Sequence, residues 1–291
     1  MLGFEPSGEG EHLLLHIRKR DQNTQWVAGL LARLAGIKRN HVSFCGLKDR
    51  FAVTTQWYSL HLPGREITPD QLQREDFEIL SVARHHKKLR RGIHSGNKFR
   101  LVLREFAALQ SHWPAIETRL EEIAGNGVPN YFGEQRFGHD GGNLVEAQSL
   151  IERDQLKGNR RGTGMILSAA RSWLFNLVLA ERIRRNSWST PMQFETQPSA
   201  PLWGRGRSAA GGDLALLEQE VLADWQSWCY ALEHAGLKQE RRATVLVPQE
   251  LQWKLLQPDQ LELSFTLPAG GYATVILREI AELFRPRIEA L

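Results

Sequence analysis

The sequence has 291 residues, of which 42% are hydrophobic and 24% are charged, and its net charge is +4. This composition is typical of a soluble globular protein, and the length can supply the cores of two ordinary domains. No apolar run reaches the roughly 18 residues of a membrane span, and two cysteines are too few for a disulfide framework or a cysteine zinc site. We expect a cytoplasmic protein with no membrane association.

The first third of the chain is predicted to contain several strands. Residues 13–17 read as a short strand, and Asn23 and Thr24 can cap a helix that Gly36 ends. The apolar face of this helix comprises Val27, Leu30, Leu31 and Leu34. Two strands are then expected to flank the turn at residues 45–50; the first carries Val42 and Phe44, and the second has Phe51, Val53, Thr55 and Trp57 on one side.

The stretch from Arg84 to Arg104 contains many basic residues and no acid. Within it, residues 97–106 alternate as a strand, with Phe99, Leu101 and Leu103 on one face and Lys98, Arg100 and Arg104 on the other. A basic run of this length is either a solvated face or a contact surface for nucleic acid.

The middle of the chain is predicted to be mostly helix and loop. Helices are expected at residues 113–123, at residues 168–185 and up to about residue 235, whereas residues 125–143 and 198–212 are rich in glycine, proline or serine. Residues 261–267 alternate as a strand, and a turn at 268–271 leads into a helix bearing Ile276, Ile280, Leu283 and Phe284. The pattern predicts a mixed α/β (α+β) protein, with a discontinuous sheet-containing domain and a helical insertion.

Several enzyme classes lack their signatures here. The chain has no phosphate-binding loop ending in Gly-Lys-Ser/Thr, no dinucleotide fingerprint and no Gly-x-Ser-x-Gly elbow. His12, His16, His85 and His86 could be considered as metal ligands, but histidines beside lysines are more typical of a surface, so no metal site is expected.

Asp49 lies in the turn between the two predicted strands and allows two interpretations. It is either a turn residue held by local hydrogen bonds and by Lys48 and Arg50, or a reactive carboxylate. A carboxylate that stays ionised can attack an electrophilic carbon, as glycosidase carboxylates do at an anomeric carbon.

Four segments resemble the TruD family of pseudouridine synthases. Residues 46–56 (GLKDRFAVTTQ) match its G-x-K-D-K/R-x-A-x-T-x-Q signature. Residues 96–104 (GNKFRLVLR), residues 128–138 (VPNYFGEQRFG), and residues 268–274 (PAGGYAT) with Arg278-Glu279 resemble further family segments in the same order. The resemblance therefore extends from residue 46 to residue 279.

The resemblance implies a function and a set of site residues. It implies cofactor-free conversion of uridine 13 of transfer RNA to pseudouridine, with Asp49 as the catalytic carboxylate and with Asn97 and Phe99 holding the target uridine. A flipped base needs an aromatic face and hydrogen-bonding groups, which Phe99 and Asn97 can supply. From the residues alone, Phe99 could equally pack in the core and Asn97 could be a turn residue after Gly96.

The expected RNA-binding residues are basic. They are Lys87, Lys88, Arg90, Arg91 and Arg136, with Arg205 and Arg207 as further contacts to phosphates. Tyr131 and Phe132 are expected to shape the wall of the site, and Lys48 and Arg50 to keep Asp49 charged. No obligatory protein partner is indicated.

The family also implies domain limits and an alternative function. Residues 1–123 and 247–291 would form a pseudouridine-synthase-like catalytic domain with a mixed sheet, and residues 124–246 the mostly helical insertion (TRUD) domain. Family members usually begin with a further strand carrying a lysine and a phenylalanine, whereas Met1 here directly precedes the stretch from Leu2 to His12. One alternative is thus a TruD-like RNA-binding protein that has lost catalysis. A further and weaker alternative, independent of the family, is an unrelated RNA-processing hydrolase that uses Asp49 with a metal.

Overall fold

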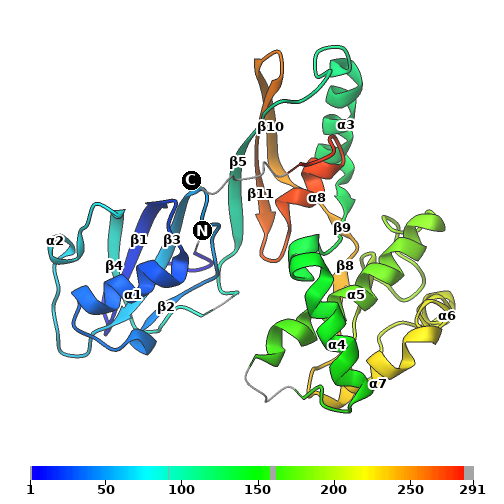
Figure 1. The fold of residues 1–291 in the computed structure, drawn as a ribbon, viewed down its shortest axis with the longest axis horizontal. Helices are drawn as coiled ribbons and strands as arrows, with labels where there is room; N and C mark the ends of the chain where they lie inside the picture. The colour runs from blue at the N-terminus through cyan, green and yellow to red at the C-terminus, as the bar shows by residue number, and fades with distance from the viewer. Residues whose placement is uncertain (1, 91, 158–161, 285–291) are drawn as a thin grey trace. The chain divides into compact units, whose positions relative to one another are not determined.

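The structure, a computed structural model, describes residues 2–90, 92–157 and 162–284 (Figure 1). The chain divides into two compact units, Met1–Asn97 and Lys98–Leu291. Both combine helices with antiparallel strand pairs, so the expected α+β class is confirmed. The strand pairs with a described register are all antiparallel, whereas a mixed sheet was expected.

The first unit is built on a four-stranded sheet. Its strands are β1 (His12–Arg20), β2 (Val42–Phe44), β3 (Val53–His61) and β4 (Phe77–His85), in the order β2-β3-β1-β4. Helix α1 (Thr24–Leu34) lies against one face of this sheet (Figure 1), and the short α2 (Pro69–Leu72) precedes β4. The central strand β1 pairs with both β3 and β4, which fixes its side chains at the middle of the unit.

Helix α1 forms where the sequence predicts it. The Asn23 side chain accepts a hydrogen bond from the Gln25 N–H, which satisfies one of the free donors at the helix start. Its buried face, which includes Val27, Ala28 and Leu31, packs with the sheet in one hydrophobic core. Strand β3 begins only at Val53, so Phe51 lies in the preceding loop and is 71% exposed.

The second unit contains two hydrophobic cores. The first joins β5 (Gly96–Leu103), β10 (Gln249–Gln257) and β11 (Gln260–Pro268), a sheet of order β10-β11-β5, to the helices α3 (Trp113–Asn126) and α8 (Ala273–Arg278). Strand β6 (Val128–Pro129) pairs with β9 (Val245–Leu246). The alternation predicted for β5 is confirmed, because Phe99, Leu101 and Leu103 pack against this core. The basic residues Lys98, Arg100 and Arg104 are exposed.

The second core is helical. It includes α4 (Gly142–Glu152), α5 (Thr163–Arg184), α6 (Gly212–Val221) and α7 (Gln226–His234), with the short strands β7 (Ser199–Leu202) and β8 (Glu240–Ala243) paired beside them. By length and composition α5 is long and apolar enough to cross a membrane, and half of its apolar window is buried inside the protein. The buried residues of α5 include Leu174, Phe175 and Val178.

Several elements differ from the sequence-based expectation. Strands β4 and β10 were not predicted, and β7 forms within the stretch from 198 to 212 that was expected to be irregular. Helix α8 ends at Arg278, so Leu283 and Phe284 lie beyond it. Strand β10 has exposed or half-exposed side chains along its length, and Leu251 and Trp253 pack against the core from alternate positions.

Candidate active site

Asp49 lies on an exposed loop between β2 and β3. Its side chain faces solvent, and none of the described residues donates a hydrogen bond to its carboxylate. In contrast, the backbone of the loop forms hydrogen bonds with three buried side chains, Lys19, Thr24 and Gln56. The carboxylate is therefore displayed on a loop whose path is fixed by the core of the first unit.

Of these anchors, Lys19 is buried as deeply as Thr24, and both are more buried than Gln56. Lys19 is only 1% exposed, and its ammonium donates hydrogen bonds to the carbonyl oxygens of Gln22 (2.6 Å) and Asp49 (3.0 Å). Burial lowers the pKa of Lys19, and the charge of Asp49 acts in the opposite direction. The buried ammonium thus interacts favourably with the Asp49 carboxylate as well as with its backbone.

Thr24 and Gln56 hold the start of the same loop. The Thr24 hydroxyl accepts a hydrogen bond from the Lys48 N–H (3.0 Å) and donates one to Gln56 Oε1 (2.9 Å). The Gln56 amide in turn donates to the Gly46 carbonyl oxygen (3.2 Å). Both side chains are at most 7% exposed, so these bonds are shielded from water.

Lys48 connects this loop to Asn97. Its ammonium donates a hydrogen bond to Asn97 Oδ1, and burial lowers the pKa of Lys48 while the charge of Asp49 raises it. Arg50 instead places its guanidinium over the ring of Phe51, 5.2 Å from the centroid. Of the two cations expected to flank the carboxylate, Lys48 links it to a predicted uridine-binding residue, and Arg50 stacks on the exposed Phe51.

Phe99 lies on strand β5, in the second unit. Its ring is half-buried and lies 5.6 Å from the ring of Phe265 on β11. The ring therefore packs against the core and is still partly exposed. Among the predicted residues, the structure thus joins Asp49 and Asn97 through Lys48 within one unit, and it describes Phe99 and Arg136 within the other.

The segment around Arg136 forms a cluster of cations and aromatic rings in the second unit. Arg136 donates to the Tyr272 hydroxyl (2.8 Å) and to Ser168 Oγ (3.0 Å), and its guanidinium lies 5.4 Å from the centre of the Phe132 ring. Arg242 lies 4.2 Å from the same ring. Burial lowers the pKa of Arg242 to about 10, which leaves it charged at neutral pH. The guanidinium of Arg136 therefore forms its contacts with residues inside this unit.

The other basic residues fall into two groups. Lys87, Lys88 and Arg90 are exposed, and no described acidic residue forms an ion pair with them. On β5, Arg100 pairs with Glu262 (2.9 Å) and Lys98 lies 3.8 Å from Glu250. Arg91 lies outside the described residues. Arg104 is exposed as well. Within this basic stretch, the accessible positive charge without a described ion pair thus lies at residues 87–90 and at Arg104.

Neither a metal nor a thiol is indicated as the reactive group. Within residues 2–90, 92–157 and 162–284, no three His, Cys, Asp or Glu side chains gather as metal ligands would. Burial raises the pKa of Cys45, and it raises that of Cys229 to about 12, so both thiols stay protonated at neutral pH. Asp49 presents an accessible carboxylate on its loop.

Sequence reasoning did not identify Lys19, Thr24 and Gln56 as parts of the site. A signal for Lys19 exists, because Leu13, Leu15, Ile17 and Lys19 occupy alternate positions of β1 and a lysine that continues a buried face needs a hydrogen-bonding partner. Thr24 was interpreted only as a helix cap, and Gln56 only as part of a motif. Their shared role depends on strand pairing that the sequence does not reveal.

Comparison with known proteins gives a consistent result. The family model described as tRNA pseudouridine synthase D (TruD) matches residues 2–158 and 189–280. The tRNA pseudouridine synthase D of Cellvibrio japonicus is 47% identical over 97% of this chain and 85% of its own length, and that of Hydrogenovibrio crunogenus is 40% identical over 97% and 89%.

A solved structure supports the same fold. A TruD crystal structure from Methanosarcina mazei superposes with a TM-score of 0.69 at 19% identity, covering 95% of this chain and 89% of that chain. The family match over most of the chain, together with relatives at 40% identity or more, exceeds what a shared fold alone would produce. This chain belongs to the TruD family of tRNA pseudouridine synthases.

Proposed function

We propose that this chain converts uridine 13 of transfer RNA to pseudouridine and that the carboxylate of Asp49 carries the reaction. The chain is an isomerase of transfer RNA by its family. The observation that supports Asp49 is its placement: an accessible carboxylate on a loop that Lys19, Thr24 and Gln56 fix from the core. A reacting group must be held in a defined geometry, and a bound backbone provides that.

The isomerisation needs no external reactant. The bond from N1 of uracil to C1′ of the ribose breaks, a bond from C5 to C1′ forms, the C5 proton leaves and N1 gains a proton. A carboxylate can assist by adding to C1′, by adding to the ring or by removing a proton from the sugar. In each case Asp49 acts as a carboxylate, and the ammonium groups of Lys19 and Lys48 lie close enough to interact electrostatically with it.

We propose that Asn97 and Phe99 hold the flipped uridine. The amide of Asn97 can hydrogen-bond the polar edge of uracil, and the Lys48 ammonium that binds Asn97 Oδ1 leaves its amide nitrogen as a donor. The accessible part of the Phe99 ring can stack on the base, which offsets part of the few kcal/mol that unstacking costs. Lys87, Lys88 and Arg90 would contact phosphates.

The proposed domain limits are 1–123 with 247–291 for the catalytic domain and 124–246 for the insertion. The two cores of the second unit support these limits. One core draws its residues from positions up to 128 and from 246 onward, and the buried residues of the other lie between 132 and 235.

The test is to incubate the protein with unmodified transfer RNA and to map pseudouridine along it. Wild type should form pseudouridine at position 13, Asp49→Asn should form none, and Asp70→Asn, a change at another exposed aspartate of the same unit, should behave as wild type. Product from Asp49→Asn would refute the role of the carboxylate. If wild type bound the RNA but formed no pseudouridine, the chain would be an RNA-binding member of the family without catalysis.

A further inference from the structure

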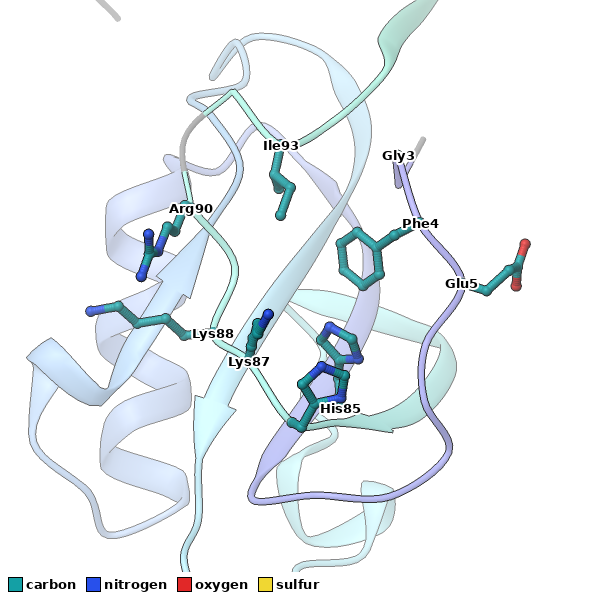
Figure 2. A pocket seen from close by; sticks show the side chains of 9 residues that line it. Gly3, Phe4, Glu5, His85, Lys87, Lys88, Arg90 and Ile93 are labelled. Carbon is teal, nitrogen blue, oxygen red and sulfur yellow. The ribbon is translucent and has the colours of Figure 1, made fainter.

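A cavity of about 510 Å³ lies in the first unit, between the segment Leu2–Gly10 and the segment from Arg84 to His94 (Figure 2). The two segments are joined at one end by a β-bridge between Leu2 and His94. At the other end the Gly8 N–H donates to the Arg84 carbonyl (3.1 Å). Between these two connections the segments separate, and the cavity occupies the space.

Glycines permit the close approach on both sides of the cavity. A Cβ at Gly3 would come within 2.6 Å of the Ile93 carbonyl oxygen, and one at Gly10 would come within 2.6 Å of the His85 carbonyl oxygen. Gly10 also has a φ of +114°, which L-residues rarely adopt. The frame of the cavity therefore depends on specific residues and is a built feature of the fold.

One wall of the cavity is aromatic. The ring of Phe4 stacks on the imidazole of His85, with the ring centroids 4.6 Å apart and the planes at 25° to each other. The ring centroid of His86 lies 4.3 Å from that of His85. Burial lowers the pKa of His85, and His85 Nδ1 accepts a hydrogen bond from the Ser7 N–H (3.2 Å). The imidazole is therefore neutral at pH 7, and it supports the Phe4 ring as a flat apolar surface.

The opposite wall is positively charged. Lys87, Lys88 and Arg90 line it, and none of them forms an ion pair with a described residue. Figure 2 shows Phe4, Lys87 and Ile93 pointing into the space between the segments, and Glu5, the one acidic residue of the lining, pointing away from it. The lining of the cavity thus includes an aromatic face and cations that form no ion pair with a described residue.

We propose that this cavity binds one nucleotide of the RNA, separate from the target uridine, with its base on Phe4 and its phosphate against Lys87 and Arg90. The inference rests on the proposed function for the identity of the RNA. Single-stranded nucleic acids are bound by this pair of features, an aromatic platform and a positive groove. The volume lies within the roughly 300–1,000 Å³ of small-ligand sites. A duplex cannot insert a paired base, so the nucleotide comes from a single-stranded or flipped position.

The test measures the dissociation constant for an unmodified transfer RNA transcript at several salt concentrations. Phe4→Leu, which keeps an apolar side chain but removes the ring, should weaken binding about fivefold to tenfold. Phe4→Tyr keeps the ring and should bind within about twofold of wild type. Lys87→Gln should lower the slope of log Kd against log salt by roughly 0.7 to 0.9, the value of one phosphate contact. Lys38→Gln, at an exposed lysine of the same unit, is the matched control.

Three results would overturn the proposal. The first is wild-type affinity in Phe4→Leu. The second is a loss of affinity in Phe4→Tyr as large as that in Phe4→Leu. The third is an effect of Lys87→Gln with no effect of either Phe4 substitution, which would indicate a charged surface without a base site. Ultraviolet cross-linking of wild type to the same RNA should place a cross-link at Phe4. Pseudouridine formation by wild type is measured separately, so loss of the nucleotide site and loss of the proposed function are distinguishable.

Discussion

Replacing Lys19 by methionine tests whether the buried anchor controls the Asp49 loop. Methionine is similar in length and can occupy the space of the lysine methylenes, so the substitution removes the ammonium with little change in packing. It leaves the carbonyl oxygens of Gln22 and Asp49 without their donor. The loop should then sample other conformations, and the carboxylate should lose its electrostatic interaction with the Lys19 ammonium.

The magnitude follows from two opposing contributions. Each hydrogen bond to a charged group contributes about 1.5–3 kcal/mol, so loss of both costs about 3–6 kcal/mol. Removing the buried ammonium also removes its desolvation penalty, which is several kcal/mol. The free energy of unfolding should therefore fall by only about 1–3 kcal/mol, within the usual range for one substitution. Loss of the bond to the Asp49 carbonyl alone would shift the loop equilibrium by about tenfold or more.

The assay combines unfolding in urea with single-turnover formation of pseudouridine at saturating protein. We expect Lys19→Met to remain folded, to bind transfer RNA with nearly unchanged affinity and to react at least about tenfold more slowly. Lys38→Met, at an exposed lysine of the same unit, should match wild type in all three measurements. If folded Lys19→Met reacted at the wild-type rate, the loop would not depend on its buried anchor.

Three further predictions concern the fold. Gly10→Ala should destabilise the protein more than Gly8→Ala in urea unfolding, because both residues have positive φ but only Gly10 would place a Cβ against the His85 backbone; equal effects would contradict this. Arg182→Met should lower the free energy of unfolding by about 3 kcal/mol, because it removes the closer of the two arginines paired with the buried Glu195; a change below about 1 kcal/mol would contradict it. Burial acts to raise the pKa of Glu195, but hydrogen bonds from Met192 N–H and Ser199 and the charge of Arg182 outweigh it, so the folded pKa lies below 4.5. The stability that Glu195 contributes should be present above pH 4.5 and lost as the pH falls through the folded pKa. The unfolding free energies of wild type and Glu195→Gln should therefore converge in acid. A difference that stays constant with pH would refute the assignment.

The sequence predicts those elements whose residues show a clear local pattern. Helix α1 has a cap, an apolar stripe and a terminating glycine, and β5 and β11 alternate regularly, so their positions are confirmed. Strand β4 has an exposed or half-exposed side chain at most positions and no regular hydrophobic period, so it is specified mainly by its pairing with β1, which is non-local information. Strand β10 does alternate at Leu251, Trp253 and Leu255, and the sequence-based prediction missed this signal.

The site divides in a similar way. Asp49, Asn97 and Phe99 lie in motifs that resemble a family, and their order along the chain is sufficient to select them. The anchors of the loop are on three different elements, and only the folded sheet brings Lys19 and Gln56 beneath Asp49. The pairing of Lys98 and Arg100 with glutamates could not be predicted either, because Glu250 and Glu262 are more than 150 residues away in the sequence.

The most direct test of the central claim follows the fate of the C5 hydrogen. Transfer RNA labelled with tritium at C5 of uridine releases tritium to water only when C5 becomes the glycosidic carbon. In a single turnover with all RNA bound, wild type should release the label of one uridine, and Asp49→Asn should release it at least about a hundredfold more slowly while binding equally well. Tritium release by Asp49→Asn at the wild-type rate would contradict the assignment of Asp49 as the reacting carboxylate.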